Sequence, residues 1–358
     1  MNYCSRCCQP DTRPKIVFKD GVCGACLWEE EKKSIDWRQR LLSLHETSIK
    51  ARIIAKQRNT YDCAIGVSGG KDSMFQVLVA KETLGLNCLL VSVAPDEITD
   101  IGRHNFENLI NHGFDCIRIY VNPKLLKELM REDFLEYCHF RKATEYPLWA
   151  SVYTVAKEKN IPLIIQGENA ALTLGVSEDM NTDWDASQVY RTNTIAGASA
   201  HGHYPEIDSK YLQLYTFPDL SDWEGQAIWL NYFVKEWSPS HNAQFAIERG
   251  LQVRDDTLDN MGRIHNYTCL DSDYHIVSQM HKYYKYGFGF ATDEVCYDIR
   301  EGLMTREEGF ELIKQYDGKC HPKYVKQFCD FIGITEKEHW DTVAKFKEYD
   351  PLGRWNER

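Results

Sequence analysis

The stretch Asp62-Cys-Ala-Ile-Gly-Val-Ser-Gly-Gly-Lys-Asp-Ser73 decides the fold of this chain. Its apolar residues up to Val67 predict a buried strand, which ends at the glycine pair Gly69 and Gly70. A helical pattern follows directly, so the first N–H groups of that helix point at whatever lies beyond the strand. Glycine also lets the backbone approach an anion closely. The stretch therefore predicts a phosphate site between a strand and a helix.

Further apolar runs follow this loop at regular intervals, with helical patterns between them. They predict strands at residues 88–93, 116–121, 161–165 and 211–217. Strands that alternate with helices indicate a parallel sheet covered by helices on both faces. We therefore expect an α/β fold in which the glycine loop follows the first strand.

Three capping-box motifs predict where helices begin after the last of these strands. Ser221-Asp-Trp-Glu224 predicts a helix running through Phe233, and Thr305 and Thr335 each precede a glutamate by three residues. The pattern beyond residue 236 is helical, so we expect a helical C-terminal domain.

Two Cys-x-x-Cys motifs lie near the start of the chain. Two such motifs supply the four thiolates that structural zinc sites use. The segment between them is short and rich in turn residues, so it could hardly fold around four unliganded cysteines. We therefore expect a zinc ribbon with the ligands Cys4, Cys7, Cys23 and Cys26, whereas Cys8 lies outside the spacing.

Four segments result from these patterns. We expect the zinc ribbon at residues 1–36, a helical linker at 37–60, the α/β domain at 61–236 and the helical domain at 237–358. Residues 177–209 are rich in polar and small side chains without periodicity, which is typical of a long loop or lid.

Composition limits the class of protein. The chain of 358 residues has no apolar window long enough to span a membrane and no signal-peptide core at its start, so we expect a cytoplasmic protein. Its 13 cysteines are an odd number, which favours reduced or metal-bound thiols over disulfides. A net charge of −11 argues against a broad nucleic-acid surface.

Two other segments carry candidate binding residues. Gly167, Glu168 and Asn169 follow the fourth strand, and ligands gather at the carboxyl ends of parallel strands. Residues 281–290 interleave aromatic and cationic side chains, which could bind a sugar or an anion. Aromatic residues at helical spacing are equally typical of a core.

The spacing around the glycine pair excludes two common phosphate motifs. A Walker loop needs Ser or Thr after its lysine, and Lys71 is followed by Asp72; the dinucleotide fingerprint is also absent. Ser68-Gly-Gly-Lys-Asp-Ser73 instead resembles the loop of the ATP pyrophosphatases, the PP-loop superfamily. The resemblance implies that ATP is cleaved between its α and β phosphates and that a carbonyl oxygen is adenylated.

The residue types of this loop suit such chemistry. A carboxylate can hold Mg²⁺ and a lysine can offset phosphate charge, so we expect catalytic roles for Lys71, Asp72, Ser73 and Glu168, with Asp72 as the magnesium ligand. ATP contacts are expected from Ser68, Gly69, Gly70, Ser73, Val93 and Gly167. The expected cofactors are thus ATP, Mg²⁺ and Zn²⁺.

The whole chain resembles the N-acetyl sugar amidotransferase family, which includes WbpG and PseA of bacterial surface-glycan and flagellin-glycan pathways. The motifs that carry this resemblance are the cysteine pairs, the loop, residues 167–169 and several C-terminal segments, at 280–289, 299–302, 305–309 and 316–318. The resemblance implies that an acetamido group of a sugar is adenylated and that ammonia displaces AMP to leave an acetamidino group. It also suggests substrate contacts from Asn169, Lys282, Lys285 and Arg300.

The source of ammonia would be a partner. No glutaminase signature is present in this sequence, so we expect a glutaminase subunit and a cyclase-like subunit similar to those of histidine biosynthesis. The alternatives are a tRNA-modifying PP-loop enzyme, of the thiolase or lysidine type, and a non-enzymatic zinc-ribbon adaptor. The acidic balance disfavours tRNA, and the complete loop disfavours the adaptor.

Overall fold

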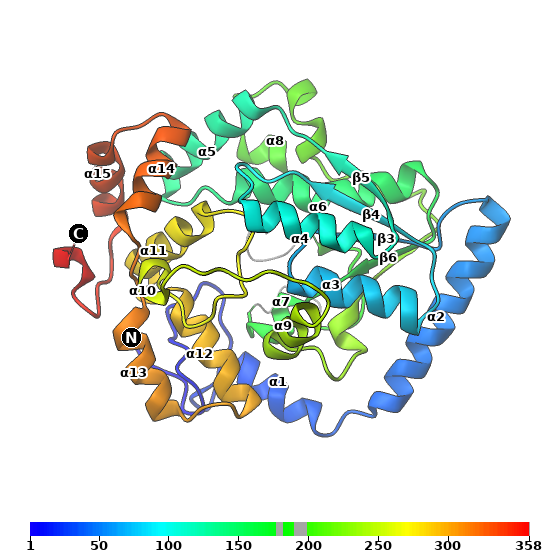
Figure 1. Ribbon diagram of the computed structural model, residues 1–358, viewed down its shortest axis with the longest axis horizontal. Coiled ribbons are helices and arrows are strands. Elements are labelled where there is room, and N and C mark those ends of the chain that lie inside the picture. The colour runs from blue at the N-terminus through cyan, green and yellow to red at the C-terminus, as the bar shows by residue number, and fades with distance from the viewer. Residues whose placement is uncertain (177–181, 190–198, 358) are drawn as a thin grey trace.

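The computed structural model describes residues 1–176, 182–189 and 199–357. Within these residues a parallel sheet forms the centre of the molecule, with the strand order β5-β4-β3-β6-β7 (Figure 1). Every neighbouring pair in it runs parallel. The strands are β3 Cys63–Gly66, β4 Cys88–Val93, β5 Asp115–Ile119, β6 Leu163–Gln166 and β7 Gln226–Trp229. The predicted α/β class is therefore confirmed.

The direction of the chain across the sheet reverses between β3 and β6. From β3 the chain builds outward to β4 and β5, and then returns to the other side of β3 for β6 and β7. Such a reversal leaves a crevice at the carboxyl ends of the two strands on either side of it. The loops that follow β3 and β6 therefore meet at this point.

Helices cover both faces of the sheet. Residues alternate across a strand, so Ile65 of β3 packs into one apolar cluster and its neighbour Ala64 into another. The first cluster includes α3, α4 and α9, and the second includes α6. Bounds of the helices in and next to these layers are α3 Lys71–Leu78, α4 Asp100–Asn111, α5 Pro123–Tyr137, α6 Lys142–Glu158, α7 Ala170–Thr173, α8 Ala200–His203 and α9 Pro239–Ile247, with a π-helical turn at Val79–Thr83.

The last strand lies elsewhere than predicted. Residues 211–217 contain 3₁₀ turns, Ser209–Tyr211 and Gln213–Tyr215, instead of a strand. Burial in this segment recurs every three residues, since Leu212 and Tyr215 are buried while Tyr211 is 58% exposed. This spacing belongs to a turn that packs on α6. Strand β7 lies at Gln226–Trp229, where Ala, Ile and Trp are buried in succession, as a parallel strand between helices requires.

The helix predicted from Ser221 to Phe233 is also absent. Glu224 forms an ion pair with Arg58, with 3.0 Å between Oε2 and Nη2, so it does not complete a capping box with Ser221. β7 and the 3₁₀ turn Leu230–Tyr232 occupy the segment instead. A capping motif thus specifies a helix only when both partners are free to bond the backbone.

The C-terminal region is helical, as predicted. Both later capping boxes form, at Thr305 and at Thr335. The helices are α10 Leu258–Met261, α11 Tyr274–Tyr286, α12 Phe290–Glu301, α13 Arg306–Tyr316, α14 Pro322–Ile332, α15 Glu336–Phe346 and a 3₁₀ turn at Arg354–Glu357. Trp237 and α9 belong to the same apolar cluster as the sheet, so the predicted boundary after residue 236 falls within a continuous core. The division into domains stays a prediction.

The N-terminal residues lie against this helical region. They contain the ribbon β1 Phe18–Lys19 and β2 Val22–Cys23, then α1 Gly24–Lys32 and the long helix α2 Trp37–Arg58. In Figure 1 the first residues, in dark blue, lie beside α12 and α13, and the two parts share an apolar cluster. No described helix is long and apolar enough to cross a membrane.

One feature of the helical core links stability to pH. His281 of α11 and His339 of α15 are buried, with 2.8 Å between their Nε2 atoms, and both stack against Phe134. Burial lowers the pKa of both histidines, that of His339 to about 3. The native protein therefore resists protonation at this pair.

We predict that the free energy of unfolding falls as the pH drops from about 6.5 towards 3. The unfolded histidines, with a pKa of about 6.5, then bind protons that the native pair excludes. Between pH 7.5 and pH 5 each histidine should lower this free energy by about 2 kcal/mol. Urea unfolding of the wild type and of His339→Gln isolates this contribution, because other groups titrate in both proteins. Equal pH slopes in the two proteins would contradict the prediction.

Candidate active site and zinc centre

The loop after β3 is shaped by one close approach of backbones. Gly69 has a φ of +95°, and a Cβ there would lie 2.8 Å from the backbone of Phe106 on α4. Only glycine fits both conditions. The Ser73 hydroxyl accepts a hydrogen bond from the Ser68 N–H at 3.1 Å, and the Ser68 hydroxyl accepts one from Gly70 at 3.4 Å. The loop is therefore held closed around the start of α3, as a phosphate cradle requires.

Asp72 is contacted on both carboxylate oxygens. Lys71 Nζ lies 2.5 Å from Oδ2, and Asn242 Nδ2 donates to Oδ1 at 2.8 Å. Burial disfavours the ammonium charge of Lys71, but the neighbouring Asp72 outweighs it and raises the Lys71 pKa. Asn242 is completely buried on α9, which packs against α3. The orientation of Asp72 thus depends on a residue 170 positions later in the chain.

Glu168 lies beside this loop because β6 neighbours β3. Its Oε1 accepts a hydrogen bond of 3.0 Å from the Tyr297 hydroxyl. Its side chain is exposed to the cavity, and the protein atoms crowded around it, together with the charge of Asp72, disfavour the carboxylate and raise its pKa. Gly167 is needed here, since a Cβ would lie 2.8 Å from the ring of Trp237. The structure therefore brings together all the predicted catalytic residues, Lys71, Asp72, Ser73 and Glu168.

A cavity of about 380 Å³ lies between this edge of the sheet and the C-terminal region. Residues 68–72, Glu168 and the start of α4 form one wall. The opposite wall comes from a different part of the chain and consists of Tyr267, Thr268, Cys269, Leu270, Asp271, His275 and Phe290. Burial lowers the pKa of His275 and raises that of Asp271, so charge is suppressed on this wall. The volume is typical of a small-molecule site.

The residues predicted for substrate contacts have other partners. Asn169 is fully buried and caps α7, accepting a hydrogen bond of 3.0 Å from Ala171 N–H. Lys282 pairs with Asp293, and Lys285 Nζ donates to the Tyr137 carbonyl at 2.6 Å.

Arg300 has a backbone partner as well. Its Nη2 donates to the Thr173 carbonyl at 3.4 Å. In the described parts of the chain, Asn169, Lys282, Lys285 and Arg300 do not line the cavity, and neither does Val93 at the end of β4. Their roles stay predictions.

Sequence reasoning missed Asn242, Tyr297 and the wall at residues 267–271. No local pattern distinguishes them, because they reach the site through the packing of α9 and α12. The segment before α11 is unusual only in the structure, where Cys269 has a positive φ of +52°.

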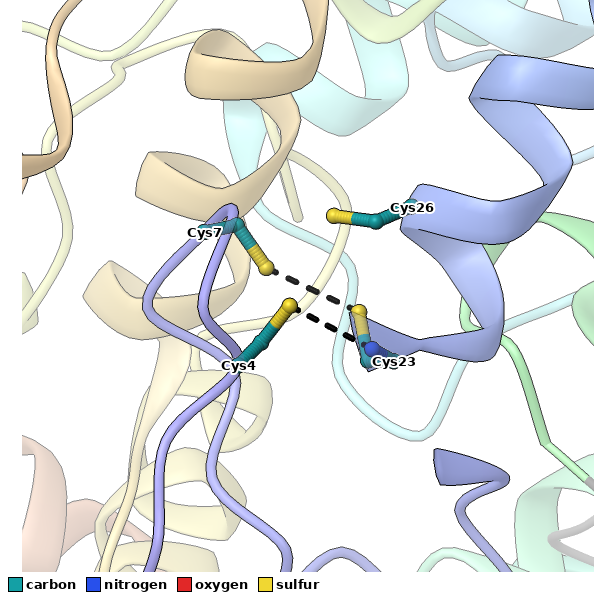
Figure 2. A group of neighbouring side chains, drawn as sticks. All are labelled: Cys4, Cys7, Cys23 and Cys26. Carbon is teal, nitrogen blue, oxygen red and sulfur yellow. Dashed lines mark hydrogen bonds between the residues drawn. The ribbon is translucent and has the colours of Figure 1, made fainter. Parts of the chain in front are cut away.

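The four predicted zinc ligands converge (Figure 2). Their Sγ atoms all lie within 4.8 Å of one another and all four residues are buried. The Sγ atoms of Cys7 and Cys23 are 3.7 Å apart. Sulfurs about 2.3 Å from a zinc ion form a tetrahedron with edges of about 3.8 Å, so this spacing fits zinc.

Backbone groups support the same assignment. The N–H of Cys23 donates to Cys4 Sγ at 3.3 Å, and the N–H of Gln9 donates to Cys7 Sγ at 3.5 Å. Such bonds stabilise thiolates. Cys8 faces away, with its Sγ 3.6 Å from the Arg306 carbonyl. A four-thiolate set leaves no open coordination position, so the ion would hold the ribbon together.

We predict that Cys7→Ser loses zinc whereas Cys8→Ser retains about one ion per chain. Both residues are buried and adjacent in sequence, but only Cys7 belongs to the four-thiol cluster. Elemental analysis of the purified variants measures the difference. Equal zinc content in the two variants, or none in the wild type, would rule out the site.

One comparison with known proteins matches part of the chain. Residues 261–352 match the family model described as "LPS biosynthesis protein WbpG-like, C-terminal domain". A search of the curated proteins found no match. Among solved structures, the chain is similar to a predicted subunit of tRNA methyltransferase from Methanocaldococcus jannaschii, at 16% identity over 52% of this chain and 75% of that one. The TM-score of 0.29 shows that the two structures superpose poorly.

The matched residues include part of the lining of the cavity. Thr268, His275 and Phe290 of the second wall all lie within residues 261–352, as do Tyr297 and both confirmed capping boxes. The family match therefore covers one side of the candidate active site as well as the helical region. Residues 261–352 thus match the C-terminal domain model of WbpG-like proteins, which agrees with the resemblance of the sequence.

Proposed function

We propose that this protein is an ATP-dependent amidotransferase that converts an acetamido group of an N-acetylated sugar to an acetamidino group. ATP would be cleaved to AMP and pyrophosphate, and ammonia would supply the nitrogen. The family model is named for LPS biosynthesis, which supports a role in making a bacterial surface or flagellin glycan.

One observation supports this proposal most strongly. The loop at residues 68–73 and the WbpG-like segment at 267–290 are far apart in sequence, yet they form opposite walls of one cavity. A site of this kind can hold a nucleotide on the loop side and an acceptor on the other. Two reactants bound in one cavity react much faster than in solution, because their relative position is already set.

The residues present have the chemistry that adenylation needs. The loop N–H groups and the Ser68 and Ser73 hydroxyls would bind the departing pyrophosphate. Asp72, held by Asn242, would carry Mg²⁺, which neutralises charge on the phosphates, and Lys71 adds a further positive charge. The acetamido oxygen then attacks the α-phosphorus and pyrophosphate leaves.

The second half of the reaction replaces oxygen by nitrogen. Ammonia adds to the carbon of the adenylated imidate, the bond from that carbon to oxygen breaks, and AMP departs with the electron pair. One proton is released overall. Glu168 is the carboxylate placed to accept it, because it lies beside the loop and its raised pKa makes it a better base than an exposed glutamate.

We predict that Asp72→Asn lowers sugar-dependent exchange of pyrophosphate into ATP by roughly 100-fold or more, because the neutral amide binds Mg²⁺ poorly. Zinc content should be unchanged, since the cysteine cluster is separate. Mass spectrometry of N-acetyl sugars after incubation with ATP, Mg²⁺ and ammonium should show the replacement of O by NH.

Three outcomes would contradict the proposal. They are ADP as the product, ATP cleavage that ignores the sugar, or full activity in Asp72→Asn. Salt-sensitive retention on tRNA, together with exchange that depends on tRNA, would instead favour a tRNA-modifying enzyme.

A further inference from the structure

A second, much smaller cavity lies on the other side of Glu168. Its volume is about 40 Å³, against about 380 Å³ for the cavity at the loop. Glu168 is the one described residue that lines both. The small cavity extends from there to Glu29 and Lys32 of α1 and to Lys235, which is exposed at the surface. It therefore connects the outside of the protein with the back of the catalytic carboxylate.

The size of this cavity limits what can occupy it. A water molecule needs about 10–15 Å³ of such space, so the cavity admits a few molecules of that size. Ammonia is similar to water in size and hydrogen bonding, whereas a sugar or a nucleotide is far too large. The cavity thus selects for a small nucleophile by volume alone.

The lining balances three carboxylates against three cations, Lys32, Lys235 and Arg300, so any attraction for ammonium comes from a local contact. Glu301 lines the cavity, and its Oε2 accepts hydrogen bonds from Ser238 and Ser240. Its buried Oε1 has no hydrogen-bond partner among the described residues. Among the tryptophan rings of the lining, Trp28 and Trp37 already have the Arg40 guanidinium over them, so Trp237 is the ring that could face a bound cation. A buried carboxylate oxygen without a partner is costly, and a bound N–H donor would relieve this cost.

The residues next to Glu168 hold it in place. The Tyr297 hydroxyl donates to Glu168 Oε1 at 3.0 Å. Arg300 lies over the Tyr297 ring, 4.6 Å from its centre, and donates to the Thr173 carbonyl. Glu168 is therefore oriented by hydrogen bonds from two neighbours, Tyr297 and Thr173.

We propose that this small cavity is the entry site for ammonia, which reaches the adenylated sugar past Glu168 and not through the cavity that binds ATP. The inference rests on the proposed function. Ammonium bound near Glu301 loses a proton to solvent at the mouth of the cavity and enters as neutral ammonia, which leaves Glu168 free to accept the proton released when ammonia displaces AMP. The lone pair of ammonia then forms the new carbon–nitrogen bond as the carbon–oxygen bond to AMP breaks. The mouth between α1 and residues 234–239 is accordingly where an ammonia-supplying protein delivers its product.

Two variants test the entry site with ammonium chloride as nitrogen source. Val234→Phe places a larger side chain in the small cavity, and Glu301→Gln removes its negative charge at nearly constant shape. Each should raise the KM for ammonium by roughly tenfold or more. Sugar-dependent pyrophosphate exchange should stay within about twofold of the wild type, because adenylation needs no ammonia. Ile247→Phe, at an exposed position on α9, is the matched control and should change neither.

The outcomes separate this inference from the proposed function. A wild-type KM for ammonium in both variants overturns the entry site and leaves the amidotransferase proposal intact. Equal losses in pyrophosphate exchange and in amidination would show that the small cavity is only a packing gap next to the active site. This outcome also overturns the entry site. If the wild type shows no sugar-dependent exchange, the proposed function fails and the entry site fails with it. Glu301→Gln decides the case should Val234→Phe not fold.

Discussion

The parallel pairing of β3 with β6 is the constraint on which the site depends. Parallel strands end at the same edge of a sheet, so the loop after β3 and the loop after β6 must meet, although about 100 residues separate them. This pairing brings Glu168 beside Asp72. Each loop also packs closely on another element, because a Cβ at Gly69 would meet the backbone of Phe106 and a Cβ at Gly167 the ring of Trp237. A shift in the pairing of these strands would separate the base from the phosphate cradle.

The remainder of the site is built by helices that pack on this edge from far along the chain. Helix α9 places Asn242 against Asp72, and α12 places Tyr297 against Glu168. Helix α12 is in turn held to the N-terminal ribbon, because Asp293 binds both Arg13 and Lys282 in a buried network. Burial disfavours a charge on Asp293, but the two cations outweigh it and lower its pKa. The four-thiol cluster therefore supports the wall of the active site that α12 provides.

Local chemistry explains which parts of the site were predictable. The glycine pair, the cysteine spacing and two of three capping boxes depend on residues within a few positions of one another, and they form as expected. The failure at Ser221 arose because Arg58, more than 160 residues away, binds the glutamate of the motif. Lys282 is a similar case, since an unpaired cation in the sequence has an ion-pair partner in the fold. Long-range ion pairs leave no trace in local patterns.

The sequence by itself determined the glycine loop between a strand and a helix, the four-cysteine cluster, the α/β class and a resemblance with which the match of residues 261–352 agrees. These follow from short-range spacing, hydrophobic periodicity and motif identity. Only the tertiary structure decided which residues surround the loop: Asn242 behind Asp72, Tyr297 behind Glu168, the second wall at residues 267–275, and the small cavity near Glu301. Those contacts join elements that are far apart in the sequence. They form because the apolar faces of α9 and α12 are buried against the sheet and the N-terminal ribbon.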